Sequence, residues 1–264
     1  NIAQGTNSII ATKMGMSLGD YVVTEAGFAA DLGAEKFLNI KCRKAGLSPK
    51  AVVIVATIRA LKYHGGQSLD TLTQEDVNAL EKGMPNLERH IESIQSFGLP
   101  VVISVNTFSS DTEAEKQFIY NHCEKLGVPV ALSYGWANGG KGCMELAEKV
   151  VASASTCNAV FKPTYNLEDG PLLKIEKICK TIYGANNVIL TALAKKQLKR
   201  FEALGYGKLP ICMAKTQKSL SDNEKLLGRP ENFDITIREF EIATGAGFII
   251  PIAGNMLRMP GLPV

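Results

Sequence analysis

In the first two thirds of the chain, short apolar runs alternate with longer amphipathic stretches. Apolar runs at residues 52–57, 101–105 and 128–132 predict buried strands, because they are short and rich in β-branched residues. Helical spacing of apolar positions predicts helices between and after these strands, at residues 73–98, 111–126 and 144–151. Pro85 is expected to kink or split the first helix. Strands separated by helices at this spacing indicate βαβ units, so the predicted class is α/β with a mostly parallel sheet.

The pattern changes after Pro163. Residues 172–183 predict an amphipathic helix, which a short strand at 188–191 and a lysine-rich helix follow. Three further strands are predicted at residues 209–214, 233–237 and 248–252. The alternation within 233–237 is typical of a half-buried antiparallel strand. The end of the chain is therefore predicted to form a small α+β domain.

Composition narrows the class of protein. The 264 residues are 45% hydrophobic and carry a net charge of +3, which is typical of a soluble globular protein and argues against nucleic-acid binding. No apolar run is long enough to cross a bilayer. The six cysteines form no CxxC pair, and the three histidines have no metal-ligand spacing to them. We therefore expect a reduced, cytoplasmic protein without a zinc site or disulfide framework.

The most informative segment reads VATIRALKYHGG at residues 55–66, and we call it the basic segment. It follows a predicted buried strand, and Arg59, Lys62 and His64 offer cationic donors for a phosphate or carboxylate. The alternative is a buried strand followed by a solvated basic turn. The residues alone leave both interpretations open.

Two aromatic residues follow neighbouring predicted strands. Phe108 comes after the strand at 101–105, and Trp136 comes after the strand at 128–132. Ligands of open parallel sheets bind beyond the carboxyl ends of the strands, so this pair could hold a flat ring. Alternatively, Phe108 caps the core and Trp136 packs under a loop. The glycine-rich GGKG at 139–142 lacks the spacing of an established phosphate-binding loop.

A third candidate is the loop TEAGFAADLGAEK at residues 24–36, after the strand-like residues 21–23. Small residues before a helix present free N–H groups that suit an anion. The alternative is a tight turn in which its acidic side chains are solvated or cap the helix. No Ser/His/Asp or Cys/His constellation can be assembled, and GxxxxGK[ST] does not occur in the 264 residues.

Four strings in the same order resemble the formate–tetrahydrofolate ligase family. They are the loop at 24–36, the basic segment at 55–66, LPICMAKT at 209–216 and MPGLP at 259–263. The whole chain resembles the second half of such an enzyme. The family's P-loop lies in the other half, so the resemblance implies that this chain is a fragment.

The resemblance implies a reaction and a fold. Family members join formate to tetrahydrofolate with ATP and Mg²⁺ through formyl phosphate, giving 10-formyltetrahydrofolate; a monovalent cation is an optional addition. The implied architecture is part of a P-loop-NTPase-like fold followed by the α+β domain. It divides into a nucleotide-binding remainder at 1–95, a folate-binding domain at 96–195 and a C-terminal domain at 196–264.

The resemblance also implies site residues. Phe108 and Trp136 fall where the family stacks aromatic rings on the folate, and Leu132 is expected in the same pocket wall. The backbone at Gly27 and the cation of Arg59 are the expected catalytic groups. The family commonly has glycine at the position of Ala29, where a methyl group is expected to restrict φ or narrow the approach to the ligand.

Two functional hypotheses follow. In the first, the chain is the folate-binding part of an ATP-dependent ligase, which forms homotetramers and acts on neither nucleic acid nor membranes. In the second, it is a non-catalytic module of the same fold that serves oligomerisation or small-anion binding. Binding of tetrahydrofolate would separate them.

Overall fold

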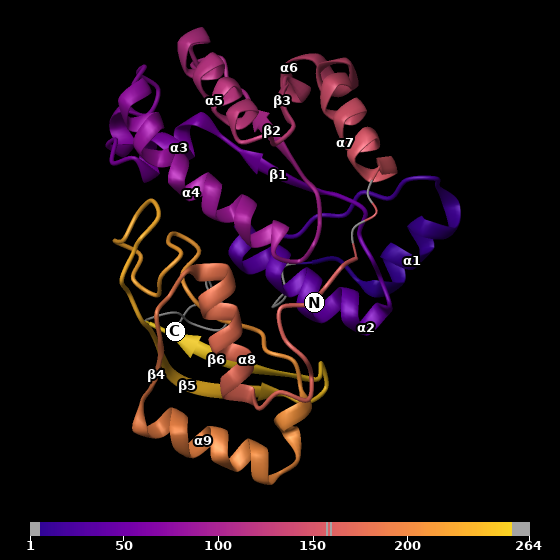
Figure 1. The fold of residues 1–264 in the computed structure, drawn as a ribbon, viewed down its shortest axis with the longest axis vertical. Helices are drawn as coiled ribbons and strands as arrows, with labels where there is room; N and C mark the ends of the chain where they lie inside the picture. Colours follow the sequence, from indigo (N-terminus) through magenta and orange to yellow (C-terminus); the bar gives the residue numbers. More distant parts are fainter. Residues whose placement is uncertain (1–5, 157, 159, 255–264) are drawn as a thin grey trace. The chain divides into compact units, whose positions relative to one another are not determined.

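The computed structural model describes residues 6–156, 158 and 160–254, which group into two compact units (Figure 1). Unit 2 comprises Pro49–Lys162 together with Leu227–Arg229. Unit 1 comprises the described residues of 1–48, 163–226 and 230–264. Each unit has its own three-stranded sheet. The three functional domains implied by the family resemblance stay a prediction.

Unit 2 is built on a parallel sheet, which confirms the predicted α/β class. Strands β1 (Val52–Ala56), β2 (Val101–Asn106) and β3 (Val130–Ser133) pair in that order, with Val52 opposite Val101 and Ile103 opposite Val130. Five of the six β2 residues are buried, as expected for a central strand covered on both faces. The P-loop-NTPase-like assignment is not tested by these three strands and stays a prediction.

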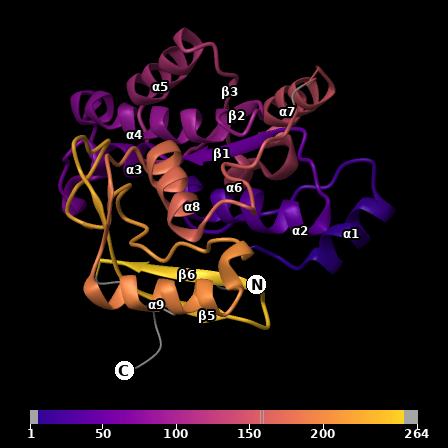
Figure 2. The ribbon, with the colours of Figure 1, turned by 60° about the horizontal axis from the view of Figure 1, so that its bottom comes forward.

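The helices of unit 2 cover both faces of this sheet. They are α3 (Ile58–His64), α4 (Val77–Gln95), α5 (Glu113–Lys125), α6 (Gly135–Asn138) and α7 (Met144–Thr156), with short 3₁₀ turns at Leu69–Thr71 and Gly139–Cys143. Figures 1 and 2 show α4 and α5 on one side of the strands and α7 on the other. Because helices cover both faces of the sheet, a ligand would reach it at the ends of the strands.

Helix α4 runs through Pro85 as one helix, so the expected split at this residue is wrong. Its buried apolar face sustains the helix despite the missing N–H. Helices α3 and α4 also touch backbone to backbone. A Cβ at Gly65 would lie 1.7 Å from the carbonyl oxygen of Ala79, and one at Gly83 would lie 1.9 Å from that of Leu61. Only glycine fits at these two positions.

Unit 1 combines a mixed sheet with helices from distant parts of the chain. Strand β4 (Val188–Leu190) pairs in parallel with β5 (Ile235–Ala243), which pairs antiparallel with β6 (Phe248–Ala253). The helices are α1 (Ile9–Leu18), α2 (Arg43–Ala45), α8 (Pro171–Ile178) and α9 (Ala192–Ala203), with π-helical turns at Ala30–Ala34, Phe37–Cys42 and Cys179–Tyr183 and a 3₁₀ turn at Tyr206–Lys208. The predicted strands at the end of the chain therefore share a sheet with an earlier strand.

Two predicted strands of unit 1 are not regular strands. Residues 21–23 are extended without a strand partner, since only Ala26 of this region forms an isolated bridge. Residues 209–214 meet β6 through two isolated parallel bridges, from Ile211 to Ile249 and from Ala214 to Ile252. A run of apolar residues specifies burial, but continuous pairing depends on partners elsewhere in the chain.

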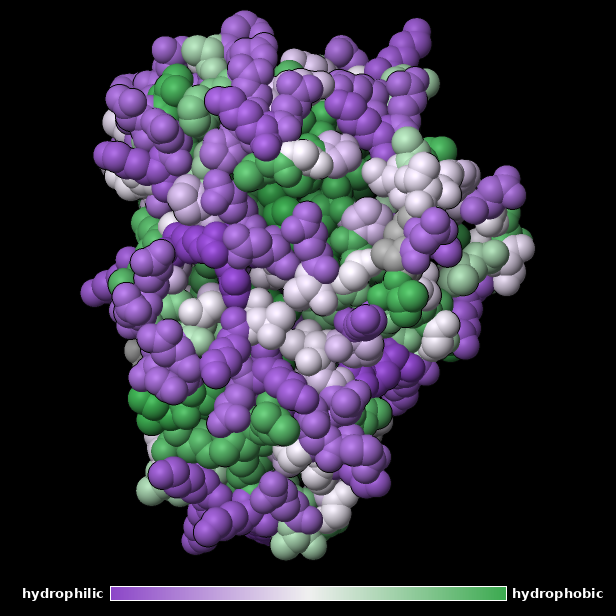
Figure 3. Space-filling view, viewed as in Figure 1, coloured by the Kyte–Doolittle hydropathy of each residue, from purple (hydrophilic) through white to green (hydrophobic). Residues whose placement is uncertain are grey.

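Helix α1 exposes a row of large apolar side chains, namely Ile10, Met14, Met16 and Leu18. The face shown in Figure 3 carries apolar patches between hydrophilic side chains. Among the described residues, no helix is both long and apolar enough to cross a membrane.

Candidate functional site

The carboxyl ends of the three parallel strands form one edge of unit 2. Ala56 pairs beside Val105, and Asn106 pairs beside Ser133, so all three strands end at this edge. The segments that follow carry Arg59, Phe108 and Trp136, respectively. The structure therefore brings together, at one sheet edge, the candidates that the sequence placed at strand ends.

Phe108 is held in a tight turn. Its N–H donates to the Asp111 carboxylate at 2.8 Å, and the N–H of Asp111 donates back to the carbonyl of Phe108 at 3.0 Å. The preceding Thr107 donates both its N–H and its hydroxyl to the carbonyl of Ser133. The turn is thereby fixed to the end of β3.

Arg59 lies against this turn. Its guanidinium carbon is 4.3 Å from the centre of the Phe108 ring, and its Nη2 donates to the Ser110 hydroxyl at 2.8 Å. Its Nε is buried and has no hydrogen-bond partner within the described part of the chain. The expected cation is therefore at the sheet edge and is stacked on an aromatic ring.

Both aromatic side chains are accessible. The exposed fraction is 93% for Trp136, on the short helix α6, and 40% for Phe108. The alternative interpretation, in which Trp136 packs under a loop, is wrong. Leu132 is partly buried in β3, and the GGKG string forms a 3₁₀ turn after α6. An exposed indole at a strand end is available to stack on a flat ligand.

The other basic residues of the basic segment have structural partners. Lys62 is fully buried, and its Nζ lies 2.7 Å from a Glu115 carboxylate oxygen and donates to the carbonyl of Gln74 at 2.7 Å. The Nδ1 of His64 accepts a hydrogen bond from the N–H of Gly228. Neither interpretation therefore fits the whole segment. Lys62 is a core residue, whereas Arg59 reaches the carboxyl edge of the sheet.

Glu115 is the partner that the sequence did not reveal. It also accepts hydrogen bonds from the N–H groups of Asp76 and Thr112, and it forms a capping box with Thr112 at the start of α5. Burial opposes the charged form, but the bonds from Lys62 and these two N–H groups outweigh it and lower the pKa of Glu115. These contacts favour the charged form of Glu115, and its carboxylate is well satisfied.

In unit 1, the loop at 24–36 folds back on itself. A Cβ at Gly33 would lie 1.8 Å from the carbonyl oxygen of Gly27, so the backbone of the loop packs directly on the π-helical turn Ala30–Ala34. Phe28 adopts φ +66°, which is unusual for an aromatic residue, and its side chain is exposed. Ala29 has φ −74°, an ordinary value for any L-residue. The methyl group of Ala29 therefore imposes no φ strain.

A buried ion pair anchors this π-helical turn. Lys215 Nζ lies 2.7 Å from an Asp31 carboxylate oxygen, and both side chains are buried. Lys215 also donates to the carbonyls of Thr216 and Ser219, and its ammonium is 4.9 Å from the ring centre of Tyr183. Asp31 is therefore a buried structural residue, which departs from the solvated or capping role in one of the two interpretations that the sequence left open.

Glu35 lies in the same buried region without a cationic hydrogen-bond partner. One of its carboxylate oxygens accepts from Asn39 at 2.7 Å, and the other has no hydrogen-bond partner in the described residues. Burial raises the pKa of Glu35 to about 7, although Lys36 and Asn39 oppose the shift. The Tyr183 hydroxyl is likewise buried without a partner among these residues, and burial raises its pKa.

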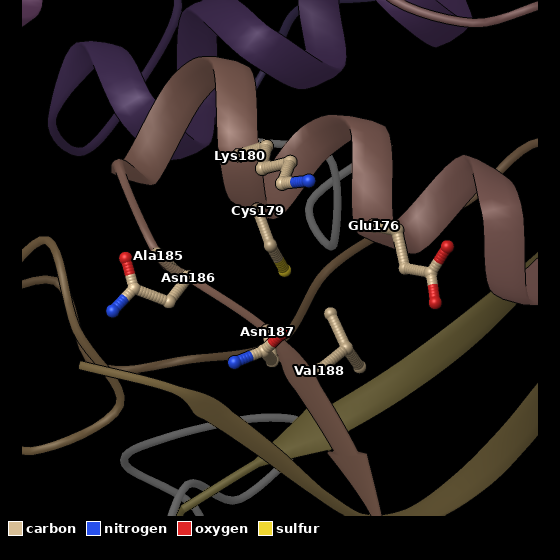
Figure 4. Close-up of a pocket in the computed structure, with 7 residues that line it drawn as sticks. All are labelled: Glu176, Cys179, Lys180, Ala185, Asn186, Asn187 and Val188. Atoms are coloured by element: carbon tan, nitrogen blue, oxygen red, sulfur yellow. The ribbon is translucent and has the colours of Figure 1, made fainter. Parts of the chain in front are cut away.

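A small pocket of about 210 Å³ lies elsewhere in unit 1, between α8, the turn Cys179–Tyr183 and β4 (Figure 4). Burial raises the pKa of the Cys179 thiol, which keeps this residue protonated and unreactive. No His, Cys, Asp or Glu cluster that could hold a metal ion occurs in the described parts of the chain. The Cys179 thiol therefore offers no nucleophile to this pocket.

Comparison with models of known protein families gives one finding. The model described as formate–tetrahydrofolate ligase matches residues 1–264. The match covers the basic segment, the loop at 24–36, the turn that carries Phe108 and the aromatic residues at the strand ends. It confirms the resemblance that the four strings indicated.

Proposed function

Because the chain belongs to the formate–tetrahydrofolate ligase family, we propose that it binds tetrahydrofolate at the carboxyl edge of the unit 2 sheet. Family members ligate formate to tetrahydrofolate in one-carbon metabolism. Phe108 and Trp136 are proposed to stack on the pteridine ring, with Leu132 in the pocket wall. The observation that carries this proposal is the exposure of both rings directly after neighbouring strands.

The proposed chemistry runs in two steps. A formate oxygen attacks the terminal phosphorus of ATP, which gives formyl phosphate and ADP, with Mg²⁺ supplied as the ATP complex. The folate nitrogen then attacks the formyl carbon, phosphate leaves and 10-formyltetrahydrofolate forms. Both steps build negative charge on oxygen, which cations and backbone N–H groups stabilise.

Two groups of this chain are proposed for those charges. In unit 1, the backbone around Gly27 supplies N–H groups from a loop that packs closely on Gly33. In unit 2, the positive charge of Arg59 acts through space from behind the Phe108 ring, without contact with the substrates. None of the 264 residues is proposed to hold the ATP phosphates, since the sequence contains no GxxxxGK[ST].

Two properties beyond the reaction are also proposed. We propose that the chain assembles as a homotetramer in the cytoplasm, which light scattering and cell fractionation would check. The competing function is a non-catalytic module for oligomerisation or small-anion binding. Folate binding is therefore the decisive property, because the competing function has no use for it.

The test is a titration of tetrahydrofolate into the chain while the fluorescence of Trp136, its only tryptophan, is followed. Saturable quenching is expected, and Trp136→Phe should abolish the signal while calorimetry still detects weakened binding. Phe108→Ala should weaken binding roughly tenfold, as loss of a stacked ring predicts. Phe118→Ala, which removes a ring from α5, is the matched control and should leave the affinity unchanged.

Absence of binding by fluorescence and calorimetry would contradict the folate site on this chain and favour the module. Binding that survives Phe108→Ala and Trp136→Phe unchanged would contradict the placement of the ring at the sheet edge. Neither result depends on ATP hydrolysis or on the formyl phosphate step.

A further inference from the structure

Two cations of the basic segment contact the chain that follows β2. Arg59 contacts Phe108 and Ser110 in the link between β2 and α5, and Lys62 binds Glu115 in the first turn of α5. This link, residues 107–112, carries the aromatic ring proposed to bind the folate. The segment therefore acts on the candidate site through a neighbouring loop.

We propose that Arg59 is a positioning residue for the folate ring, acting through Phe108. This inference rests on the proposed function and deepens it by assigning the geometry of the stacking surface. The guanidinium packs on the Phe108 ring at 4.3 Å and is itself tied to Ser110. The ring is thus held between a fixed cation and the ligand, and it presents its other surface to the pteridine.

The contacts around the turn explain why this arrangement is rigid. The backbone of Phe108 is fixed at both ends by Asp111, and Thr107 is tied to Ser133. Backbone contacts do not restrain the side chain, which is 40% exposed. The guanidinium supplies that restraint, because a planar cation on an aromatic face is attracted to the ring quadrupole.

A ring held in place before binding gives a tighter complex. A free phenyl side chain loses rotational freedom when a ligand stacks on it, and this cost weakens binding. A ring already held by Arg59 avoids most of this cost. The cation also withdraws electron density from the ring, which favours stacking with the electron-rich tetrahydropteridine.

Isothermal titration calorimetry with tetrahydrofolate on the 264-residue chain tests the proposal. Arg59→Met keeps the length of the side chain and removes the cation, and it should raise Kd roughly three- to tenfold. Arg59→Lys retains a cation without the planar fork and should have a smaller effect. Ser110→Ala frees the guanidinium and should raise Kd about twofold. Arg89→Met, in α4, is the control and should leave Kd unchanged.

A double-mutant cycle separates positioning from direct contact. If Arg59 acts through the ring, Arg59→Met should change Kd no further once Phe108→Leu has removed that ring. A purely structural role would not give this coupling, and neither would a direct contact between Arg59 and the ligand. The thermal unfolding midpoint of each variant is measured in parallel. If Arg59→Met does not fold, the Arg59→Lys and Ser110→Ala variants carry the test.

Three outcomes would overturn the proposal. An unchanged Kd in Arg59→Met, Arg59→Lys and Ser110→Ala would show that the stack is irrelevant to binding. If Arg59→Met weakens binding by the same factor in the Phe108→Leu background as in the unaltered chain, Arg59 acts directly on the ligand. Absence of binding by the unaltered chain would remove the proposed function and this inference together, which distinguishes it from the first two results.

Discussion

Each unit buries a lysine–carboxylate pair beside a candidate loop, but the two pairs differ in their surroundings. In unit 2, Glu115 receives Lys62 and two backbone N–H groups, so its charge is well compensated. In unit 1, the pair of Lys215 with Asp31 lies near Glu35, which has an unpartnered oxygen and a pKa of about 7. The carboxylate of the pair in unit 2 is therefore compensated, whereas unit 1 holds a buried carboxyl, Glu35, with a raised pKa.

The difference shows what fixes a buried charge. Burial costs both pairs several kcal/mol per ion, and the attraction within a pair recovers it only when hydrogen bonds also satisfy the remaining lone pairs. Glu115 gains those bonds from the N-cap residues of α4 and α5, where N–H groups are left without helical partners. Glu35 has no such source within the described residues and is stabilised in its neutral form instead.

The largest expected effect comes from breaking the satisfied pair. Lys62→Met leaves the Glu115 carboxylate buried without its cation, so the free energy of unfolding should fall by about 3–5 kcal/mol. Chemical denaturation followed by circular dichroism measures this loss. The double variant Lys62→Met/Glu115→Leu should recover most of it, because no uncompensated charge remains.

The matched control is Lys208→Met, which removes an exposed pair with Glu168 and should cost less than about 1 kcal/mol. A loss of that small size for Lys62→Met as well would mean that the buried pair contributes little to the fold of unit 2.

The second effect is a pH dependence that unit 1 should show. The pKa of Glu35 is 4.5 in a solvated carboxyl and about 7 in the folded chain, so the folded state holds the proton more tightly. The stabilising contribution is complete below pH 4.5 and is lost as the pH rises through 7. At ~1.4 kcal/mol per pKa unit, the loss amounts to about 3 kcal/mol.

Glu35→Gln checks this pH dependence. The variant should be more stable than the unaltered chain at pH 8 by up to about 3 kcal/mol and little different at pH 5. Denaturation midpoints at several pH values give the comparison, with the exposed Glu231→Gln as the control. An advantage of equal size at both pH values would count against a buried proton on Glu35.

The smallest effect concerns the cap that satisfies Glu115. Thr112→Ala removes the hydroxyl that accepts from the N–H of Glu115, and it should cost about 1 kcal/mol of unfolding free energy. Thr156→Ala, at an exposed helical position, should stay within about 0.5 kcal/mol of the unaltered chain. If both substitutions cost the same, the cap does not support the buried pair.

The sequence predicted the parallel sheet because its evidence is local. Buried β-branched runs gave β1, β2 and β3 to within two residues, and the aromatic residues after β2 and β3 were placed correctly at the strand ends. Of the kink or split expected at Pro85, the split was wrong, because tertiary burial of the surrounding apolar face outweighs one missing hydrogen bond.

The partners of the charged residues were not predictable in the same way. Lys62 and Glu115 lie 53 positions apart, and no local pattern announces their pairing. The string from Thr112 to Glu115 does carry the spacing of a capping box, which would have identified Glu115 as a helix cap. It would not have revealed the lysine, because long-range pairing depends on how β1 and β2 are ordered.

The glycine that nearly ends the basic segment has a consequence for how such a string is used. Gly65 is required because α3 and α4 meet there backbone to backbone. Lys62 and Gly65 therefore report on how two helices cross and how a loop is supported, and neither contacts the sheet edge. A chain that had lost its chemistry would still be under selection to keep both residues for folding. A match to this string therefore indicates that a chain has this fold. Evidence of activity has to come from the exposed rings at the strand ends.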